Sequence, residues 1–217
     1  SREDDVWNRF CYRQQASRAV RSRIDIVRDL MAGVIRRATG PTRFLDVASG
    51  PGRIERKVID LLGSPPHPVH VDLVDADADA VEYARALLVD DVPPGYHFSV
   101  HHRNAFRFEP AHQYDAIWSC GLFDYLDDRL ATRLLAKMYA WLRPGGDLLV
   151  GNFAKECTTQ WIMEGLYGWT LLYRTNEECE QLCYAAGIPV EQLMLERDAT
   201  GSVVLMRYSL LQFSALF

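Results

Sequence analysis

From residue 43 onward, short apolar runs alternate with helical stretches, and this alternation constrains the fold more than any other feature of the chain. Strands separated by helical segments of this length form βαβ units, whose right-handed crossovers make a mostly parallel sheet. The predicted class is therefore doubly wound α/β. The expected strands are 43–48, 69–75, 96–102, 114–119 and 147–153, and the expected helices are 52–62, 78–89 and 127–142.

Both ends of the chain add elements to this pattern. Apolar residues recur at helical spacing over residues 18–37, which predicts an amphipathic N-terminal helix. Residues 175–186 begin with the spacing of a capping box, Thr175 and Glu178, which predicts a further helix. The stretches "EQLMLE" and "SVVLMRY", joined by a turn at Gly201, then predict that the sheet finishes with a hairpin.

Composition excludes several classes of function. The chain of 217 residues, 48% hydrophobic, is long enough for one substantial core. Its net charge of -5 argues against a nucleic-acid partner, and no apolar run is long enough to cross a membrane. The five cysteines lack CxxC spacing, which predicts no metal site and favours a reducing, cytoplasmic location. Nothing in the sequence indicates the oligomeric state.

The loop in "FLDVASGPGR", residues 44–53, follows the first expected strand of the sheet. In an open parallel sheet, ligands bind at the carboxyl ends of the strands, where the strand order reverses. Gly50 and Gly52 allow a ligand to approach the backbone, but the loop matches neither the phosphate-binding P-loop nor GxGxxG. A ligand without a pyrophosphate is therefore favoured.

The next strand ends in Asp75, at the tip of "VHVDLVD". An acid about 20 residues after a glycine loop, on the adjacent strand, is placed to accept hydrogen bonds from both hydroxyls of a ribose. The competing reading is an exposed acid that caps the next helix, and this suits Asp77 and Asp79 better. The expected cofactor therefore contains a nucleoside.

Five stretches in this order and spacing, "FLDVASGPGR", "VDLVDADADAVEYA", "NAFRF", "YDAIWSCGLFDYLDD" and "LRPGGDLLVGNF", closely resemble the motifs of class I S-adenosylmethionine-dependent methyltransferases. The resemblance covers residues 43–208 and includes the terminal hairpin. It implies a Rossmann-like, mostly parallel seven-stranded sheet and S-adenosylmethionine as the cofactor. It also suggests two parts within one compact unit, an N-terminal helical lid over residues 1–40 and a cofactor-binding α/β domain over residues 41–217.

The resemblance assigns cofactor-binding roles residue by residue. The glycine loop would face the methionine part of the cofactor, Asp75 the ribose, and Ala76 and Ala105 the adenine. Asn104 stands where the family commonly has an acid, so it could accept a hydrogen bond from the adenine or be an ordinary turn residue. The full set is Asp46, Ala48, Ser49, Gly50, Gly52, Asp75, Ala76, Asn104, Ala105, Ser119, Cys120 and Gly121.

The residues that act on the acceptor are harder to predict, because methyl transfer from a sulfonium needs mainly alignment and a base only for a protonated nucleophile. The candidates are polar and aromatic residues beyond the cofactor motifs, with Tyr12, Asn152 and Tyr173 as the expected catalytic residues. The competing reading for each aromatic is a place in the core. No histidine stands out as a base.

A narrower resemblance is to bacterial methyltransferase-like proteins associated with fatty-acid methyl ester synthesis. The shared features are an arginine-rich N-terminal helix, "GLFDYL", "GNF" and the Trp-to-Tyr-Arg segment of "GWTLLYRT". Those relatives are expected to have an acid just before the Trp, where this chain has Gly168. This departure puts a carboxylate base at that position in doubt.

Three functions remain open from the sequence. The first is methyl transfer to a small molecule. The second is cyclisation of S-adenosylmethionine itself, in which the α-amino group attacks the γ-carbon to give azetidine-2-carboxylate and methylthioadenosine. The third is a non-catalytic S-adenosylmethionine sensor. Products formed from the cofactor alone, or only with an acceptor, would distinguish them.

Overall fold

The computed structural model describes residues 9–89 and 92–209. Its sheet has seven strands in the order β3-β2-β1-β4-β5-β7-β6. Strands β1 to β5 pair in parallel, and β7 pairs antiparallel with both β5 and β6. The predicted doubly wound sheet with a terminal hairpin is confirmed. The strands are β1 Thr42–Val47, β2 Val69–Asp75, β3 Tyr96–His102, β4 Tyr114–Ser119, β5 Leu142–Phe153, β6 Leu193–Arg197 and β7 Val203–Tyr208.

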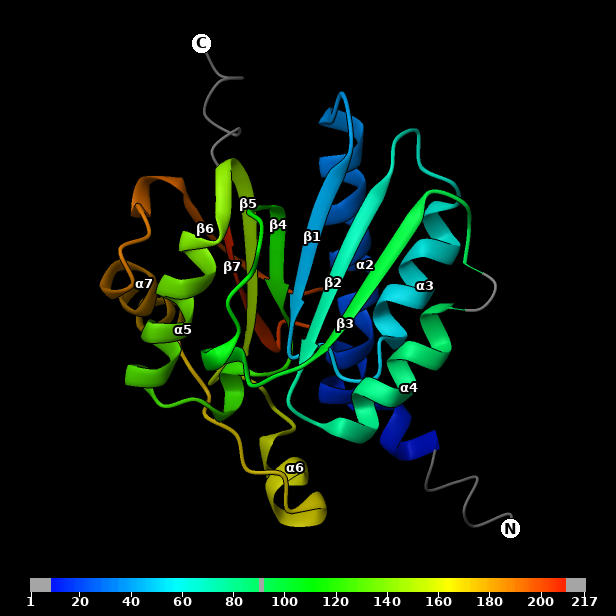
Figure 1. Cartoon of the computed structure of the whole chain (residues 1–217). Coiled ribbons are helices and arrows are strands. Elements are labelled where there is room, and N and C mark those ends of the chain that lie inside the picture. Colours follow the sequence, from blue (N-terminus) through cyan, green and yellow to red (C-terminus); the bar gives the residue numbers. More distant parts are fainter. Residues whose placement is uncertain (1–8, 90–91, 210–217) are drawn as a thin grey trace.

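Helices lie on both faces of the sheet and enclose two hydrophobic cores (Figure 1). One face carries α2 Gln15–Arg37, α3 Arg53–Leu62 and α4 Ala78–Val89, and the other carries α5 Asp128–Ala140 and α7 Asn176–Ala185. Neighbouring residues of a strand enter different cores: Phe44 packs in the first and Leu45 in the second. Burial on both faces explains why the central strands are nearly continuous apolar runs.

Most of the shorter elements surround the carboxyl ends of the parallel strands. They are the single turns η1 Ala105–Arg107 and η2 Phe123–Tyr125 and the helix α6 Gln160–Tyr167, which lies beyond the ends of the strands (Figure 1). A third turn, η3 Val190–Gln192, precedes β6, which runs parallel to β5, so η3 lies at the opposite edge of the sheet. The capping box predicted for α7 is present, since Thr175 and Glu178 each bond the other's backbone N–H through the side chain. No helix in the described part of the chain could span a membrane.

Helix α2 begins at the carboxyl edge of the sheet and continues across one face. Near its start, Gln15 donates to the Thr200 carbonyl at 2.7 Å and accepts a hydrogen bond from the Thr158 hydroxyl. Further along, Val27 and Met31 are buried in the core. The first turns of α2 are therefore attached to the loops at the edge where a ligand is expected, and the rest holds the sheet. The division into a lid and a main domain at residue 40 stays a prediction.

Candidate functional site

A small cavity lies where the strand order reverses, between β1 and β4. Its volume is about 130 Å³, and it is lined by Ala48, Val74, Asp75, Ala76, Arg103, Asn104, Ala105, Phe106 and Leu122. These residues follow the carboxyl ends of β1 to β4, which meet here because the strands are parallel. Five of them belong to the predicted cofactor-binding set, so the structure brings together residues separated by up to 57 positions, from Ala48 to Ala105. The cavity is at the place where doubly wound folds bind their ligands.

The loop after β1 is built from left-handed residues, and its two glycines have different reasons to be glycine. Ala48, Gly50 and Gly52 have φ values of 60°, 58° and 68°. A Cβ on Gly52 would lie 2.9 Å from Cδ1 of Leu88, so this glycine is needed for α4 to pack under the loop. A Cβ on Gly50 would meet no atom within 4 Å, which leaves the space beside this backbone open to a ligand.

Asp75 connects the glycine loop to the end of β2. Its Oδ2 accepts the backbone N–H of Gly50 at 2.7 Å, and its Oδ1 accepts that of Asp77 at 2.9 Å. A carboxylate has about four lone-pair sites, so each oxygen can accept one more hydrogen bond. The side chain is partly exposed where it lines the cavity. Asp75 can thus accept the two vicinal hydroxyls of a ribose.

A pair of buried carboxyl groups lies beneath the loop. Asp46 is 3% exposed and Glu55, in the first turn of α3, is 1% exposed. Neither oxygen of Glu55 has a hydrogen-bond partner in the described part of the chain. Burial raises the pKa of Asp46 well above its ordinary value, and the nearby Glu55 carboxyl raises this pKa further. A cation bound beside the loop would favour the ionised form of this pair, because an opposite charge lowers the pKa of a carboxyl group.

Asn104 and Ala105 form the wall of the cavity at the end of β3. The Asn104 side-chain oxygen accepts the Phe106 N–H at 2.9 Å and caps the η1 turn. The structure therefore gives Asn104 the turn role that the sequence held open, while leaving it in the cavity lining. Ala105 lines the same wall, and its role toward the adenine stays a prediction.

The stretch after β4 closes the site from the other side. Ser119 is fully buried and donates to the Val47 carbonyl at 2.8 Å, which joins β4 to β1. Burial raises the pKa of the Cys120 thiol to about 12, so this cysteine is not a thiolate at neutral pH. Beside it, a Cβ on Gly121 would lie 3.0 Å from a guanidinium nitrogen of Arg23, a side chain of α2.

Two of the three predicted catalytic residues lie on adjacent segments, since Asn152 bonds the Leu172 carbonyl and Tyr173 packs against Phe153. Tyr12 is 62% exposed and stacks under Arg21, with 3.6 Å between the guanidinium carbon and the ring centroid. Tyr173 packs edge-on against Phe153, and burial raises its pKa to about 12, so it can donate a hydrogen bond but cannot act as a base near neutrality. Asn152 is fully buried. The roles of all three stay predictions.

Asn152 belongs to a buried network around Arg174. The Arg174 guanidinium donates to Asn152 Oδ1 and to the carbonyls of Phe123 and Leu126. Asn152 in turn donates to the Leu172 carbonyl at 2.9 Å. This network fixes the η2 turn against the segment after α6, with the Asn152 side chain bonded to Arg174 and to the Leu172 carbonyl.

Asp124, in the η2 turn, is a candidate that the sequence analysis missed. It is 3% exposed, its Oδ1 accepts the Phe153 N–H at 2.6 Å, and its Oδ2 has no hydrogen bond within the described residues. Burial raises its pKa to about 6, although that hydrogen bond and the charges of Arg23 and Arg174 oppose the rise. A carboxylate with such a pKa is suited to accept a proton near neutral pH. In "FDYLDD", only its burial distinguishes it from the exposed acids that follow.

The described residues contain no cluster of three or more histidine, cysteine or acidic side chains able to hold a metal ion. The groups at the strand ends are the open glycine loop, the Asp75 carboxylate and the buried acids. An open backbone, two free acceptor positions and an acidic floor fit a cationic nucleoside.

Comparison with known proteins supports S-adenosylmethionine as the cofactor. A family model described as "Methyltransferase domain" matches residues 44–146, from β1 into β5. No curated protein matches the chain significantly.

Several solved structures share the fold. A possible exported protein from Bordetella parapertussis has a TM-score of 0.74 at 20% identity, over 92% of this chain and 71% of that protein. Magnesium protoporphyrin IX methyltransferase from Synechocystis PCC 6803, with bound S-adenosylmethionine, has a TM-score of 0.62 at 8% identity, over 90% of this chain and 81% of that protein. The S-adenosylmethionine-dependent methyltransferase SibL has a TM-score of 0.60 at 20% identity, over 77% of this chain, which matches half of SibL's length.

Proposed function

Because the chain carries a methyltransferase domain of the class I S-adenosylmethionine-dependent superfamily, we propose that it transfers the cofactor's methyl group to a small-molecule acceptor. The observation that carries this proposal is the position of Asp75, bonded to the glycine loop and lining the cavity at the reversal of strand order. The acidic composition supports a small acceptor over a nucleic acid. A cytoplasmic location belongs to the same proposal and rests on the five free cysteines.

The residues of this chain would hold S-adenosylmethionine along the loop and the adjacent strand ends. Asp75 would bind the ribose hydroxyls, and Ala76 and Ala105 would lie against the adenine. The backbone at Gly50 would face the methionine part, where nothing blocks its approach. The cofactor, once bound, supplies an activated methyl group. The acidic pair Asp46 and Glu55 favours this ligand electrostatically because its sulfonium and ammonium are both cationic.

Asp124 would act on the acceptor as the general base. Its free Oδ2 and its pKa of about 6 allow it to take the proton that a hydroxyl or amine nucleophile loses. Because the Phe153 N–H holds Oδ1 at 2.6 Å, the carboxylate cannot rotate freely. Asn152 and Arg174 would act as positioning residues, since they fix the η2 turn that carries Asp124.

The proposal is tested by product analysis. The protein is incubated with methyl-labelled S-adenosylmethionine, alone and with pools of small-molecule acceptors, and the nucleoside products are separated by chromatography. We expect S-adenosylhomocysteine, and a labelled methylated product, only when an acceptor is present. Methylthioadenosine formed from the cofactor alone would contradict methyl transfer and would favour cyclisation. Tight binding without turnover in any pool would favour a sensor.

The base assignment has its own control. Asp124→Asn should lower kcat while leaving S-adenosylhomocysteine affinity within about twofold, because the carboxylate lies beyond the cofactor contacts. Asp127→Asn is the matched control, since Asp127 is an exposed acid in the same stretch and asparagine caps a helix about as well as aspartate. Equal kcat in wild type and Asp124→Asn would contradict the assignment.

A further inference from the structure

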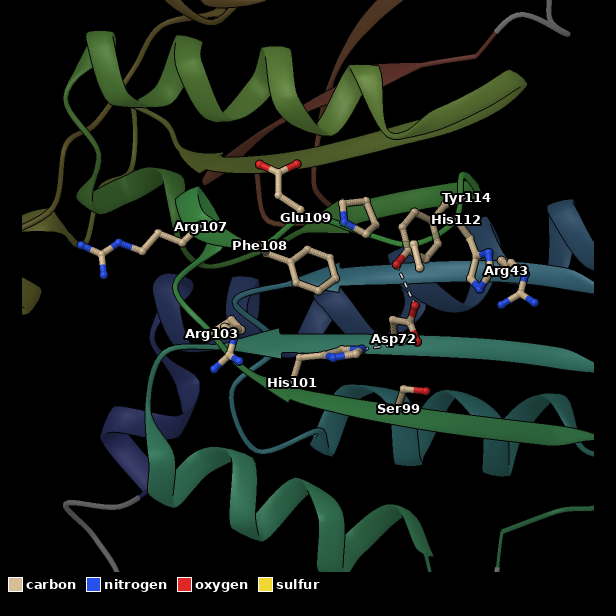
Figure 2. A pocket seen from close by; sticks show the side chains of 12 residues that line it. Arg43, Asp72, Ser99, His101, Arg103, Arg107, Phe108, Glu109, His112 and Tyr114 are labelled. Atoms are coloured by element: carbon tan, nitrogen blue, oxygen red, sulfur yellow. Dashed lines mark hydrogen bonds and ion pairs between the residues drawn. The ribbon is translucent and has the colours of Figure 1, made fainter.

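One part of the sheet has no helix over it among residues 9–89 and 92–209. The connection from β3 to β4, residues 103–113, contains only the single turn η1, whereas α5 and α7 cover the neighbouring half of the same face. Figure 2 shows the consequence: side chains from β1, β2 and β3 point into a space bordered by the connection itself. This region lies beside the cofactor cavity and has no part in the proposed reaction.

The sequence of these strands matches an uncovered face. Residues that point toward α2–α4 are apolar, such as Phe44 and Leu73, and lie in the core. Side chains on one face of a strand recur every second residue. On this face Leu45, Val47 and Val74, toward the carboxyl ends of β1 and β2, pack in the second core. The residues of alternate position that precede them, and those of β3, point to the open side and are polar. They include Arg43, His70, Asp72, His97, Ser99 and His101. The open face is therefore polar by its sequence and does not expose a core.

A cavity of about 460 Å³ occupies this face, and its acids are already paired. Asp72 Oδ2 accepts the Tyr114 hydroxyl at 2.7 Å, and its Oδ1 lies 3.7 Å from Nε2 of His101. Glu109 pairs with Lys137 at 2.7 Å. Among the described residues, neither carboxylate forms an ion pair with an arginine of the cavity.

Those arginines have no acidic partner among the described residues. Arg43 and Arg107 line the cavity without a side-chain hydrogen bond or ion pair, and Arg103 donates only to the His102 carbonyl, at 3.1 Å. In Figure 2, Arg43 stands at one end of the cavity, and Arg103 and Arg107 stand near the other. An excess of guanidinium groups gathered in a cavity is notable in a chain whose net charge is -5.

We propose that this cavity is a second binding site, which takes a small multivalent oxyanion bearing phosphate or carboxylate groups. Guanidinium groups bind both groups through paired N–H donors, and their separation along the cavity favours a ligand with more than one anionic group. The ring of Phe108, 5.2 Å from that of His101 between centroids, gives the cavity an aromatic wall. The site is distinct from the cofactor cavity and independent of the reaction proposed there.

The two sites share one wall. Arg103 lines both cavities, and its backbone N–H donates to the Asp75 carbonyl at 2.8 Å. An anion in the second site would therefore lie next to the strand ends that hold the cofactor without occupying the same volume.

Calorimetric titration with pyrophosphate and with citrate at low salt tests the proposal, and the two probes show which oxyanion the site prefers. Each titration is run on the full chain with and without saturating S-adenosylhomocysteine. We expect one saturable site in both conditions. Arg43→Gln should weaken binding about tenfold, because it removes a charge-assisted contact, and Arg107→Gln should weaken it in the same direction.

Arg56→Gln is the matched control, because it removes a guanidinium from α3, on the opposite face of the sheet. This variant should bind each probe within about twofold of wild type. The absence of saturable binding, or an equal loss in Arg43→Gln and Arg56→Gln, would overturn the proposal. Competition by S-adenosylhomocysteine would also overturn it, since the probe would then occupy the cofactor cavity. If S-adenosylhomocysteine does not bind, the titration run without it still tests the anion site. The proposed function and the proposed anion site can therefore fail independently.

Discussion

Asp75 accepts the backbone N–H of Gly50 at 2.7 Å, and this contact joins the end of β2 to the glycine loop after β1. The residue expected to hold a ribose is thus also the residue that shapes the loop expected to face the methionine. Cofactor recognition and loop geometry depend on one carboxylate, so a substitution at Asp75 should preserve an acceptor oxygen if the two roles are to be separated.

The two glycines of the loop should differ in their cost when replaced. Gly52→Ala should lower the free energy of unfolding by about 2–4 kcal/mol, because the new Cβ would lie 2.9 Å from Leu88 Cδ1 and the residue has a positive φ. Gly50→Ala should cost about 1–2 kcal/mol, since only the backbone strain applies. Urea denaturation of both variants measures the difference. Equal losses of unfolding free energy in the two variants would contradict the claim that Gly52 is needed for Leu88 to pack under the loop.

Asp46→Asn should stabilise the ligand-free protein above neutral pH. The folded pKa of Asp46 is raised above its ordinary value of 3.8, so the folded state binds the proton more tightly than the unfolded chain. Stability from this group is therefore present at low pH and is lost as pH rises toward the folded pKa.

At pH 8, Asp46→Asn should raise the free energy of unfolding, because asparagine carries no charge that has to be buried. The gain should shrink as the pH falls and should vanish below the ordinary value of 3.8, where both states bind the proton. Asp79→Asn, at an exposed position in α4, should show no such trend. A gain that did not depend on pH would contradict the role of ionisation.

Arg174→Gln should destabilise the fold by about 3 kcal/mol or more. Its guanidinium is buried, and the carbonyls of Phe123 and Leu126 would lose their donor. Asp128→Asn is the control: this partner's side chain is 81% exposed, so its ion pair with Arg174 should contribute less than about 1 kcal/mol. Thermal unfolding of both variants measures which of the two loses more stability. A larger loss in Asp128→Asn would mean that the ion pair, not the carbonyl contacts, holds the η2 turn.

The fold could be predicted more completely than the site, and particular residues show why. The strand and helix pattern depends on local spacing, so the capping box at Thr175 was readable and the helix start was confirmed. Strand β5 begins at Leu142, five residues before the expected 147, because "RPGG" reads as a turn but forms an irregularity within the strand, between the pairs Tyr114–Leu142 and Ala116–Asp147. Helix α6 was not predicted, since Ile162 and Met163 are its only buried residues.

The site depended on contacts between residues distant in the sequence. Asp75 could be predicted because it ends a strand at a fixed distance from the glycine loop. Asp124 could not, because its pKa of about 6 results from burial, and the contact that holds it is with the Phe153 N–H, 29 residues away. Asn152 was expected to be catalytic, but its side chain faces Arg174, a partner that spacing alone does not reveal.

The rate of methyl transfer should report the ionisation of Asp124. As a base it must be unprotonated, so kcat/KM should rise with pH and level off above an apparent pKa of about 6. Measurement from pH 5 to 8 with a saturating cofactor checks this, and Asp124→Asn should remove the rise. A rise of the same midpoint in Asp124→Asn would assign the ionisation to another group.

The central claim is that Asp75 and the glycine loop form the S-adenosylmethionine site, and calorimetric titration with S-adenosylhomocysteine tests it directly. Asp75→Asn keeps one acceptor oxygen for the loop but removes the charge and one acceptor for the ribose, so affinity should fall about 10- to 100-fold. Asp77→Asn, an exposed acid whose Oδ1 caps α4, should bind within about twofold of wild type. Equal affinity in wild type and Asp75→Asn, with both folded by circular dichroism, would contradict the account.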